Sequence, residues 1–306
     1  MKAHKKYMDI IRFGKSGTTQ AIQEGTHISI TEKLDGANAS FTYDKEATNG
    51  VQAFSRRQVL DEEESLNGFF QWVQTNIAPI KENLVKNYRY YGEWLVKHSV
   101  TYNPTYYRNF YLFSVWDEDK EEYLSDEVVK QEAERLGLKT VPFLYEGEFI
   151  SFEHIMSFVG KSNMTLEPNK GEGVVVKDAT YKNRYGHQLF VKFIATEFSE
   201  VAQQKVHNVD TELLASLQKV DMVATKNRTE KMLLKLVDEG IIPSDYSLKK
   251  DMGLILREMN LAIYDDIMKE ESDELEGLDE KTIRKRISKV IPTQIRGILV
   301  AQGRDK

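Results

Sequence analysis

The chain has 306 residues, of which 41% are hydrophobic and 29% are charged. This balance is typical of a globular protein with enough chain for two domains. There is no cysteine, which excludes disulfides, thiolate nucleophiles and cysteine metal sites and suits a reducing cytoplasm. The net charge of −6 excludes a protein that coats nucleic acid through bulk positive charge, although a local basic groove stays open.

The termini and the apolar runs give no sign of a targeting or membrane segment. The N-terminus has lysines but no apolar stretch behind them, so no signal peptide is expected. No apolar run approaches the roughly 20 residues that span a bilayer. We therefore expect a cytoplasmic protein that contacts no membrane, and we expect it to be a monomer.

Strand and helix patterns alternate up to about residue 200 and then change character. Period-two alternation and runs of aromatic and β-branched residues predict strands at 26–32, 38–43, 51–55, 88–96, 110–116, 172–177 and 188–194. Apolar residues at helical spacing predict helices at 61–86, 125–136 and 151–160. Beyond residue 200 the strand patterns vanish, and amphipathic helices are expected across 210–301.

Residues 31–38, Thr-Glu-Lys-Leu-Asp-Gly-Ala-Asn, join two of the predicted strands. Lys33 could attack the α-phosphate of a nucleotide and hold it as a phosphoramidate, which is covalent catalysis by an amine. Gly36 would let the backbone turn tightly where a Cβ would clash. The plainer interpretation is a surface lysine before an Asp-Gly turn, and only the segments downstream favour the catalytic one.

Later segments supply the groups that a lysine nucleophile would need. Arg56 ends a strand and offers a planar fork for a phosphate or a sugar. Glu93 and Glu172 each stand beside a glycine, and their carboxylates suit a ribose hydroxyl or a hydrated metal ion. Phe113 closes an aromatic run that offers a face for a base. Lys192 lies in an apolar strand, where an unpaired ammonium is costly unless it points outward.

In this order, the segments resemble the motifs of the covalent nucleotidyltransferases, which include polynucleotide ligases and messenger RNA capping guanylyltransferases. The chain is most similar to the bacteriophage-type RNA ligase 2 family, whose members seal nicks in duplex RNA with ATP. The resemblance covers nearly the whole chain. The matching segments are 33–38, 55–56, 92–93, 110–113, 172–177 and 191–192, with looser matches at 197–200, 227–228 and 265–267.

The resemblance implies an α+β fold. An adenylyltransferase domain of antiparallel β-sheets with flanking helices would occupy 1–203, and a small all-α RNA-binding domain would occupy 210–306. An RNA ligase of this kind would bind RNA ends or a nicked duplex, and it would use ATP with Mg²⁺ or Mn²⁺.

The resemblance also assigns roles to individual residues. Lys33 would be the nucleophile, Lys192 and Glu172 would assist it, and Glu93 and Glu172 would hold the metal ion. Arg228 and Asp266 would contact RNA. The residues that would bind ATP or AMP are Glu32, Lys33, Leu34, Asn38, Arg56, Glu93, Phe113 and Lys192. AMP would pass from Lys33 to an RNA 5′-phosphate, and a 3′-hydroxyl would then displace it.

Two positions depart from the family pattern. The aspartate usual after the stacking phenylalanine is Ser114, and the second lysine of the last motif is Ile194. An active enzyme would need a replacement cation, for which Lys177 and Arg57 are the first candidates. Strict alternation puts Lys177 on the opposite face from Glu172, so its role stays open.

Two other classes of function stay open. DNA ligases and capping enzymes usually carry an oligonucleotide-binding β-barrel after the catalytic domain, and the helical pattern here speaks against them. A protein that binds adenylate and nucleic acid without sealing is the second class, and only the missing lysine favours it.

Overall fold

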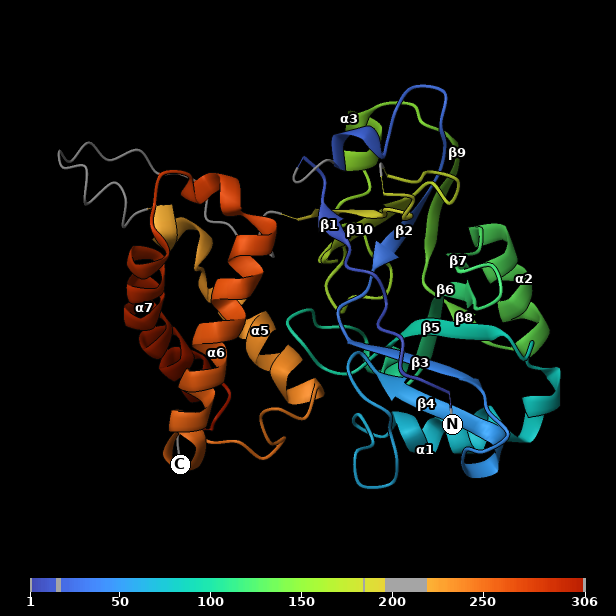
Figure 1. The fold of residues 1–306 in the computed structure, drawn as a ribbon, viewed down its shortest axis with the longest axis horizontal. Coiled ribbons are helices and arrows are strands. Elements are labelled where there is room, and N and C mark those ends of the chain that lie inside the picture. Colours follow the sequence, from blue (N-terminus) through green and yellow to red (C-terminus); the bar gives the residue numbers. More distant parts are fainter. Residues whose placement is uncertain (1, 15–17, 184, 196–218, 305–306) are drawn as a thin grey trace. The chain divides into compact units, whose positions relative to one another are not determined.

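The computed structural model describes the whole chain except residues 1, 15–17, 184, 196–218 and 305–306. It divides into two compact units, Met1–Ala195 and Thr196–Lys306 (Figure 1). The first unit mixes antiparallel sheets with helices, and the second is helical wherever it has regular structure among its described residues, so the expected α+β fold class is confirmed. The expected boundary between 203 and 210 and the expected motif at 197–200 lie outside the described residues.

The first sheet of the N-terminal unit has the strand order β1-β11-β10-β2-β9. Its pairs are antiparallel except that of β1 with β11. One face is apolar and packs against the short helix α3 (Phe152–Met156), because alternate residues of β2 and β10 on this face are Ile or Val. The strands are β1 (Ile11–Arg12), β2 (His27–Lys33), β9 (Phe143–Glu148), β10 (Gly173–Lys177) and β11 (Val191–Ile194).

The second sheet has the order β4-β3-β5-β6-β7, and β8 pairs with β6. Helices α1 (Phe69–Asn76) and α2 (Asp126–Leu136) cover one of its faces and close the largest core of the unit (Figure 1). The strands are β3 (Ala37–Tyr43), β4 (Val51–Ser55), β5 (Tyr88–Trp94), β6 (Phe110–Asp117), β7 (Glu122–Tyr123) and β8 (Lys139–Thr140).

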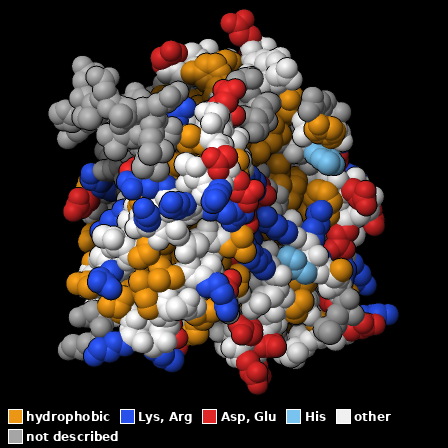
Figure 2. Space-filling model, turned by 60° about the vertical axis from the view of Figure 1, so that its left-hand side comes forward, with side chains coloured by type: hydrophobic (Ala, Val, Ile, Leu, Met, Phe, Trp, Pro, Cys, Tyr) orange, Lys and Arg blue, Asp and Glu red, His pale blue; other side chains and the backbone are white. Residues whose placement is uncertain are grey.

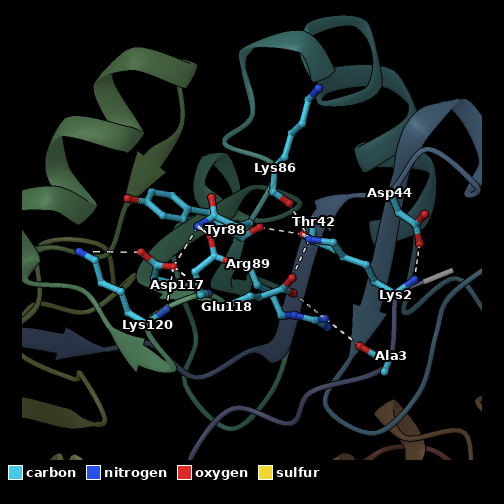
Figure 3. A network of polar contacts seen from close by, with 12 residues as sticks. Lys2, Ala3, Thr42, Asp44, Lys86, Tyr88, Arg89, Asp117, Glu118 and Lys120 are labelled. Carbon is cyan, nitrogen blue, oxygen red and sulfur yellow. Dashed lines mark hydrogen bonds and ion pairs between the residues drawn. The ribbon is translucent and has the colours of Figure 1, made fainter.

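An N-terminal segment without regular structure, residues 2–10, is tied to the second sheet. Arg89, 2% exposed, donates a 2.7 Å hydrogen bond to the Ala3 carbonyl, and Lys2 Nζ forms a 2.7 Å ion pair with Glu118 (Figure 3). Further along, the Tyr91 hydroxyl donates to the Lys5 carbonyl at 2.7 Å. These bonds bring Tyr7 into a cluster of aromatic side chains with Tyr91, Tyr123 and Phe190.

The helical unit packs three long helices around one core of isoleucine, leucine and methionine. Each helix starts at a side-chain cap, since Thr225, Ser247 and Asp279 each accept a hydrogen bond from the backbone amide three residues on. Residues 219–223 are also helical. The helices are α5 (Lys226–Asp238), α6 (Leu248–Glu270) and α7 (Glu280–Ala301), and a 3₁₀ turn (Ser272–Leu275) precedes α7.

Some of the expected elements differ in the structure. The helix expected over 61–86 is wrong in its extent, because left-handed backbone at Leu66 and Asn67 delays its start and a 3₁₀ helix (Ala78–Asn83) replaces its end. Strands β1, β7, β8 and β9 were not expected, since three of them have two residues and β9 lacks an apolar alternation.

Candidate active site between the two sheets

Lys33 and Glu172 meet at the end of the first sheet. The β2–β10 ladder ends with Lys33 opposite Gly173, and Glu172 is the next residue outward. Lys33 Nζ donates a 2.6 Å hydrogen bond to Glu172 Oε2, and the glutamate side chain is 0% exposed whereas that of Lys33 is 26% exposed. A Cβ on Gly173 would lie 2.1 Å from the Phe193 carbonyl oxygen, so only glycine fits there. The lysine is thus accessible at a point where its carboxylate partner is buried.

The second sheet contributes Glu93 and Asn38 to the same place. These residues are directly opposite each other on β5 and β3, so their side chains share one face. Glu93 Oε1 accepts a 2.8 Å hydrogen bond from the Gly36 amide, which joins it to the turn after Lys33. Burial raises the pKa of Glu93 to about 7, although the Lys33 ammonium and the Gly36 amide act in the opposite direction.

Asp35 has a structural task that the sequence did not reveal. Its Oδ2 accepts a hydrogen bond from the Val100 amide at 2.8 Å, and its own amide donates to the Tyr102 hydroxyl at 2.8 Å. A Cβ on Gly36 would lie 2.6 Å from the Trp94 carbonyl oxygen. The Asp-Gly pair therefore fastens the turn after Lys33 to the segment that follows β5.

Lys192 lies on the same sheet face as Lys33. Val175 pairs with both Thr31 and Lys192, and Gly173 pairs with both Lys33 and Ile194. Ile194 and Lys33 therefore lie in one line across the sheet, with Gly173 between them. They are two strands apart, which is about 10 Å at normal strand spacing. This register places Lys192 on the face opposite the apolar one.

Arg12 was missed in the sequence because β1 has only two residues. Arg12 pairs with Lys192 in a parallel register, so it extends the row of cations on this face. Neither of the two candidates for a replacement cation is presented to the site as Lys192 is. Lys177 lies on the same face but is 5% exposed and bonded within the protein, and Arg57 is an exposed residue beyond the end of β4.

Arg56 is held close to the second sheet by the N-terminal segment. Its Nη2 forms a 2.5 Å ion pair with Asp9 Oδ1. Asp9 is near Tyr7, which packs edge-on against Phe113 at a ring distance of 4.9 Å. The segment thus supports two of the expected nucleotide-binding residues.

Glu32 and Leu34 are buried, at 2% and 4% exposed. Glu32 pairs with Val174 and therefore lies on the apolar face of the first sheet, away from Lys33. Burial raises the pKa of Glu32 to about 7, partly offset by a hydrogen bond with Ser162. The structure does not bring this carboxylate to the site face, so what Glu32 can offer a nucleotide there is its backbone.

The expected RNA contact by Arg228 and Asp266 is not supported by the helical unit. Arg228 is 1% exposed, and its Nη1 lies 2.5 Å from Asp266 Oδ2, while Nη2 is 3.5 Å from the buried Glu271. An arginine in this position ties α5 to α6 and is not presented to a phosphate. The burial of Arg228 fits a structural ion pair, and the RNA contact stays a prediction.

The carboxylates near Lys33 suit a magnesium or manganese ion better than a metal ion whose ligands all come from the protein. Among the described residues, no group of three or more His, Asp or Glu side chains forms a metal cluster. Mg²⁺ is usually held by one or two carboxylates together with substrate phosphates, and Glu93 and Glu172 meet that need.

Comparisons with known proteins give the family of this chain. A family model described as RNA ligase matches residues 26–194, more than half of the 306 residues, so the chain belongs to the RNA ligase family. No curated protein matches.

Solved structures of Naegleria gruberi RNA ligase are similar to this chain. A mutant with ATP and Mn is 21% identical over 64% of this chain and 57% of that one, with a TM-score of 0.48. The ligase with PPi is 19% identical over the same shares, with a TM-score of 0.47. This chain spans little more than half the length of these structures.

Proposed function

We propose that this chain is an ATP-dependent RNA ligase that joins a 3′-hydroxyl to a 5′-phosphate, with nicks in duplex RNA as its substrate and Lys33 as its nucleophile. The family and the 2.6 Å pair of Lys33 with the buried Glu172 carry this proposal. Similar ligase structures were solved with ATP and Mn, which supports ATP and a divalent ion as its cosubstrate and cofactor. The expected cytoplasmic location stays a prediction, and among the described residues no helix has the length and hydropathy to cross a membrane.

In the first step, the Lys33 amine forms a bond to the α-phosphorus of ATP, and the bond to pyrophosphate breaks. The amine must be neutral to attack, so Lys33 gives up its proton before the new bond forms. Glu172 holds Lys33 in place until the nucleotide arrives. AMP then passes to the RNA 5′-phosphate, and the 3′-hydroxyl oxygen displaces AMP as the new phosphodiester forms.

Lys192 and the groups around it act on the phosphate. A preorganised cation near the α-phosphate stabilises the negative charge that develops on its oxygens. Glu93 and Glu172 would hold the divalent ion, which supplies further charge neutralisation when bound. Phe113 would stack on the base, because bulged backbone turns its half-buried ring away from the regular pleat.

A stripe of cations on α7 is the surface that we assign to the RNA backbone. Lys281, Lys285 and Lys289 are exposed and follow one another at four-residue spacing, and the exposed Arg296 is seven residues further on the same face. The stripe is about 22 Å long at 1.5 Å per residue. No acidic residue follows Glu280 in this helix. Figure 2, turned so that the left-hand side of Figure 1 comes forward, shows many Lys and Arg side chains among hydrophobic and acidic ones.

The stripe can be tested with matched charge removals. Lys285→Gln with Lys289→Gln should weaken binding of nicked duplex RNA about tenfold at low salt and reduce the salt dependence by about two phosphate contacts. Lys249→Gln with Lys250→Gln, two exposed lysines at the start of α6, is the control. Fluorescence anisotropy across a salt series gives both quantities. Equal losses from the two pairs would contradict an RNA surface on α7.

The sealing reaction itself is tested on a nicked RNA duplex with a labelled 5′-phosphate. With ATP and Mg²⁺, the labelled strand should pass through an adenylylated form and then appear at full length. A protein that accepts AMP from ATP but never extends the strand would contradict the ligase and favour an adenylate-binding protein without sealing activity. Sealing of the same nick when the RNA strands are replaced by DNA would favour the DNA ligase alternative.

A further inference from the structure

Phe113 lies at a β-bulge between β5 and β6. Tyr91 pairs with Ser114 and Gly92 pairs with Leu112, so Phe113 is an extra residue without a partner across the ladder. A bulge of this kind re-aims a side chain but leaves a backbone carbonyl outside the ladder. The Phe113 carbonyl needs another donor to remain buried.

Lys177 provides that donor from the other sheet. Its Nζ lies 2.5 Å from the Phe113 carbonyl oxygen, 2.9 Å from Asp126 Oδ1 and 3.5 Å from Ser114 Oγ. Lys177 is 5% exposed and lies on the Lys33 face of the first sheet, opposite Ser29. An ammonium has three N–H donors, so these three contacts occupy it fully.

The negative charge for this buried lysine comes from helix α2. Asp126 is the first residue of that helix, where the N-terminal dipole favours an anion, and its other oxygen accepts a hydrogen bond from Ser29 Oγ. Ser114, where the resemblance to the ligase family implies an aspartate, is 2% exposed, and its hydroxyl forms a 2.9 Å hydrogen bond with that of Tyr7. The carboxylate therefore reaches Lys177 from a helix instead of from the strand that carries Phe113.

We propose that Lys177 is a positioning residue that holds the bulge at Phe113 for stacking on the base of ATP, and that Asp126 takes over the counter-charge that position 114 lacks. The proposal rests on the proposed function, because it assumes that ATP binds against Phe113. It also explains why Lys177 is not the phosphate cation that replaces the second lysine of the last motif.

The test uses ATP binding, which does not depend on catalysis. In a Lys33→Ala background, isothermal calorimetry measures the Kd for ATP with and without Asp126→Asn. Loss of the counter-charge should loosen the bulge and raise the Kd about tenfold. Adding Ser114→Asp restores a carboxylate within reach of Lys177, and the Kd should return to within about twofold of the Lys33→Ala value.

A structural control separates positioning from general stability. Arg135→Gln removes a partly exposed ion pair with Glu132 on the same helix, and it should lower Tm without changing the Kd for ATP. If Asp126→Asn does not fold, the swap of Asp126→Ser with Ser114→Asp should still fold and bind ATP. An unchanged Kd in Asp126→Asn, or a swap that folds but binds ATP weakly, overturns the positioning proposal. A Lys33→Ala protein that does not bind ATP at all overturns the proposed function as well.

Discussion

The two faces of the first sheet are made by alternate residues of the same strands, yet one is apolar apart from Glu32 and the other carries cations. One face carries Ile28, Ile30, Val174 and Val176 in a dry core, and the other carries cations. The cations are tolerated because each has a partner or partial exposure: Lys177 has Asp126, and Lys33 has Glu172. The difference shows that a strand with period-two alternation can place a core and a reaction site back to back.

The most severe test of the cationic face is loss of Lys33. Lys33→Ala should abolish covalent attachment of AMP, since no other amine occupies its place at the end of β2. Lys33→Arg should fail as well, because a guanidinium does not deprotonate. Gel labelling with ATP that carries the label in its α-phosphate measures the adduct. A labelled Lys33→Ala protein would show that the reactive group lies elsewhere.

The second prediction concerns the row of cations next to Lys33. Lys192→Ala should slow adenylylation roughly a hundredfold, or about 3 kcal/mol, since it removes a preorganised charge near the phosphate. Ile194→Ala should mainly lower stability, and Ile194→Lys should leave the rate equal or higher because its row is that of Lys33. Single-turnover rates of adenylylation for the three variants measure these effects.

Arg12 sharpens this prediction, since it stands beside Lys192 in the sheet. If Arg12 supplies the charge that Ile194 lacks, Arg12→Gln should slow adenylylation about tenfold, and Ile194→Lys should recover part of the loss. If Arg12→Gln adenylylates at the rate of the wild type, Arg12 does not act in the site. A Lys192→Ala rate near that of the wild type would mean that Lys192 does not contact the phosphate.

The smallest expected effect belongs to Glu32 on the apolar face. Burial raises its pKa to about 7 from the usual 4.5, so the folded state binds a proton that the unfolded state has released. The free energy of unfolding should therefore decrease as the pH rises from about 4.5 to about 7. Glu32→Gln should lose this part of the pH dependence and gain relative stability at pH 8. Urea unfolding across the pH range measures it, and parallel curves for the two proteins would contradict the buried carboxylate.

The sequence predicted the motif strands because their alternation is strong. The strand expected at 26–32 is β2 at His27–Lys33, and that at 110–116 is β6 at Phe110–Asp117. The β2–β10 register brings Lys33 to Glu172, and the hydrogen bond from the Gly36 amide brings Glu93 to the same turn. Their roles in catalysis remain predictions.

Long-range packing could not be predicted in the same way. The N-terminal segment has no period, so nothing in it indicated that Tyr7 would reach Phe113 or that Asp9 would reach Arg56. Asp126 is the first residue of helix α2, and its contact with Lys177 depends on how α2 meets the first sheet. Arg228 resembled a site residue, although its burial fits a structural ion pair better.

The central claim is that Lys33 carries AMP. After incubation with ATP and Mg²⁺, proteolysis and mass spectrometry should locate an acid-labile AMP adduct on the peptide that contains Lys33. The label should leave when pyrophosphate is added, because the first step is then reversed. An adduct on Lys177 or Lys192, or an adduct that resists acid, would contradict the account.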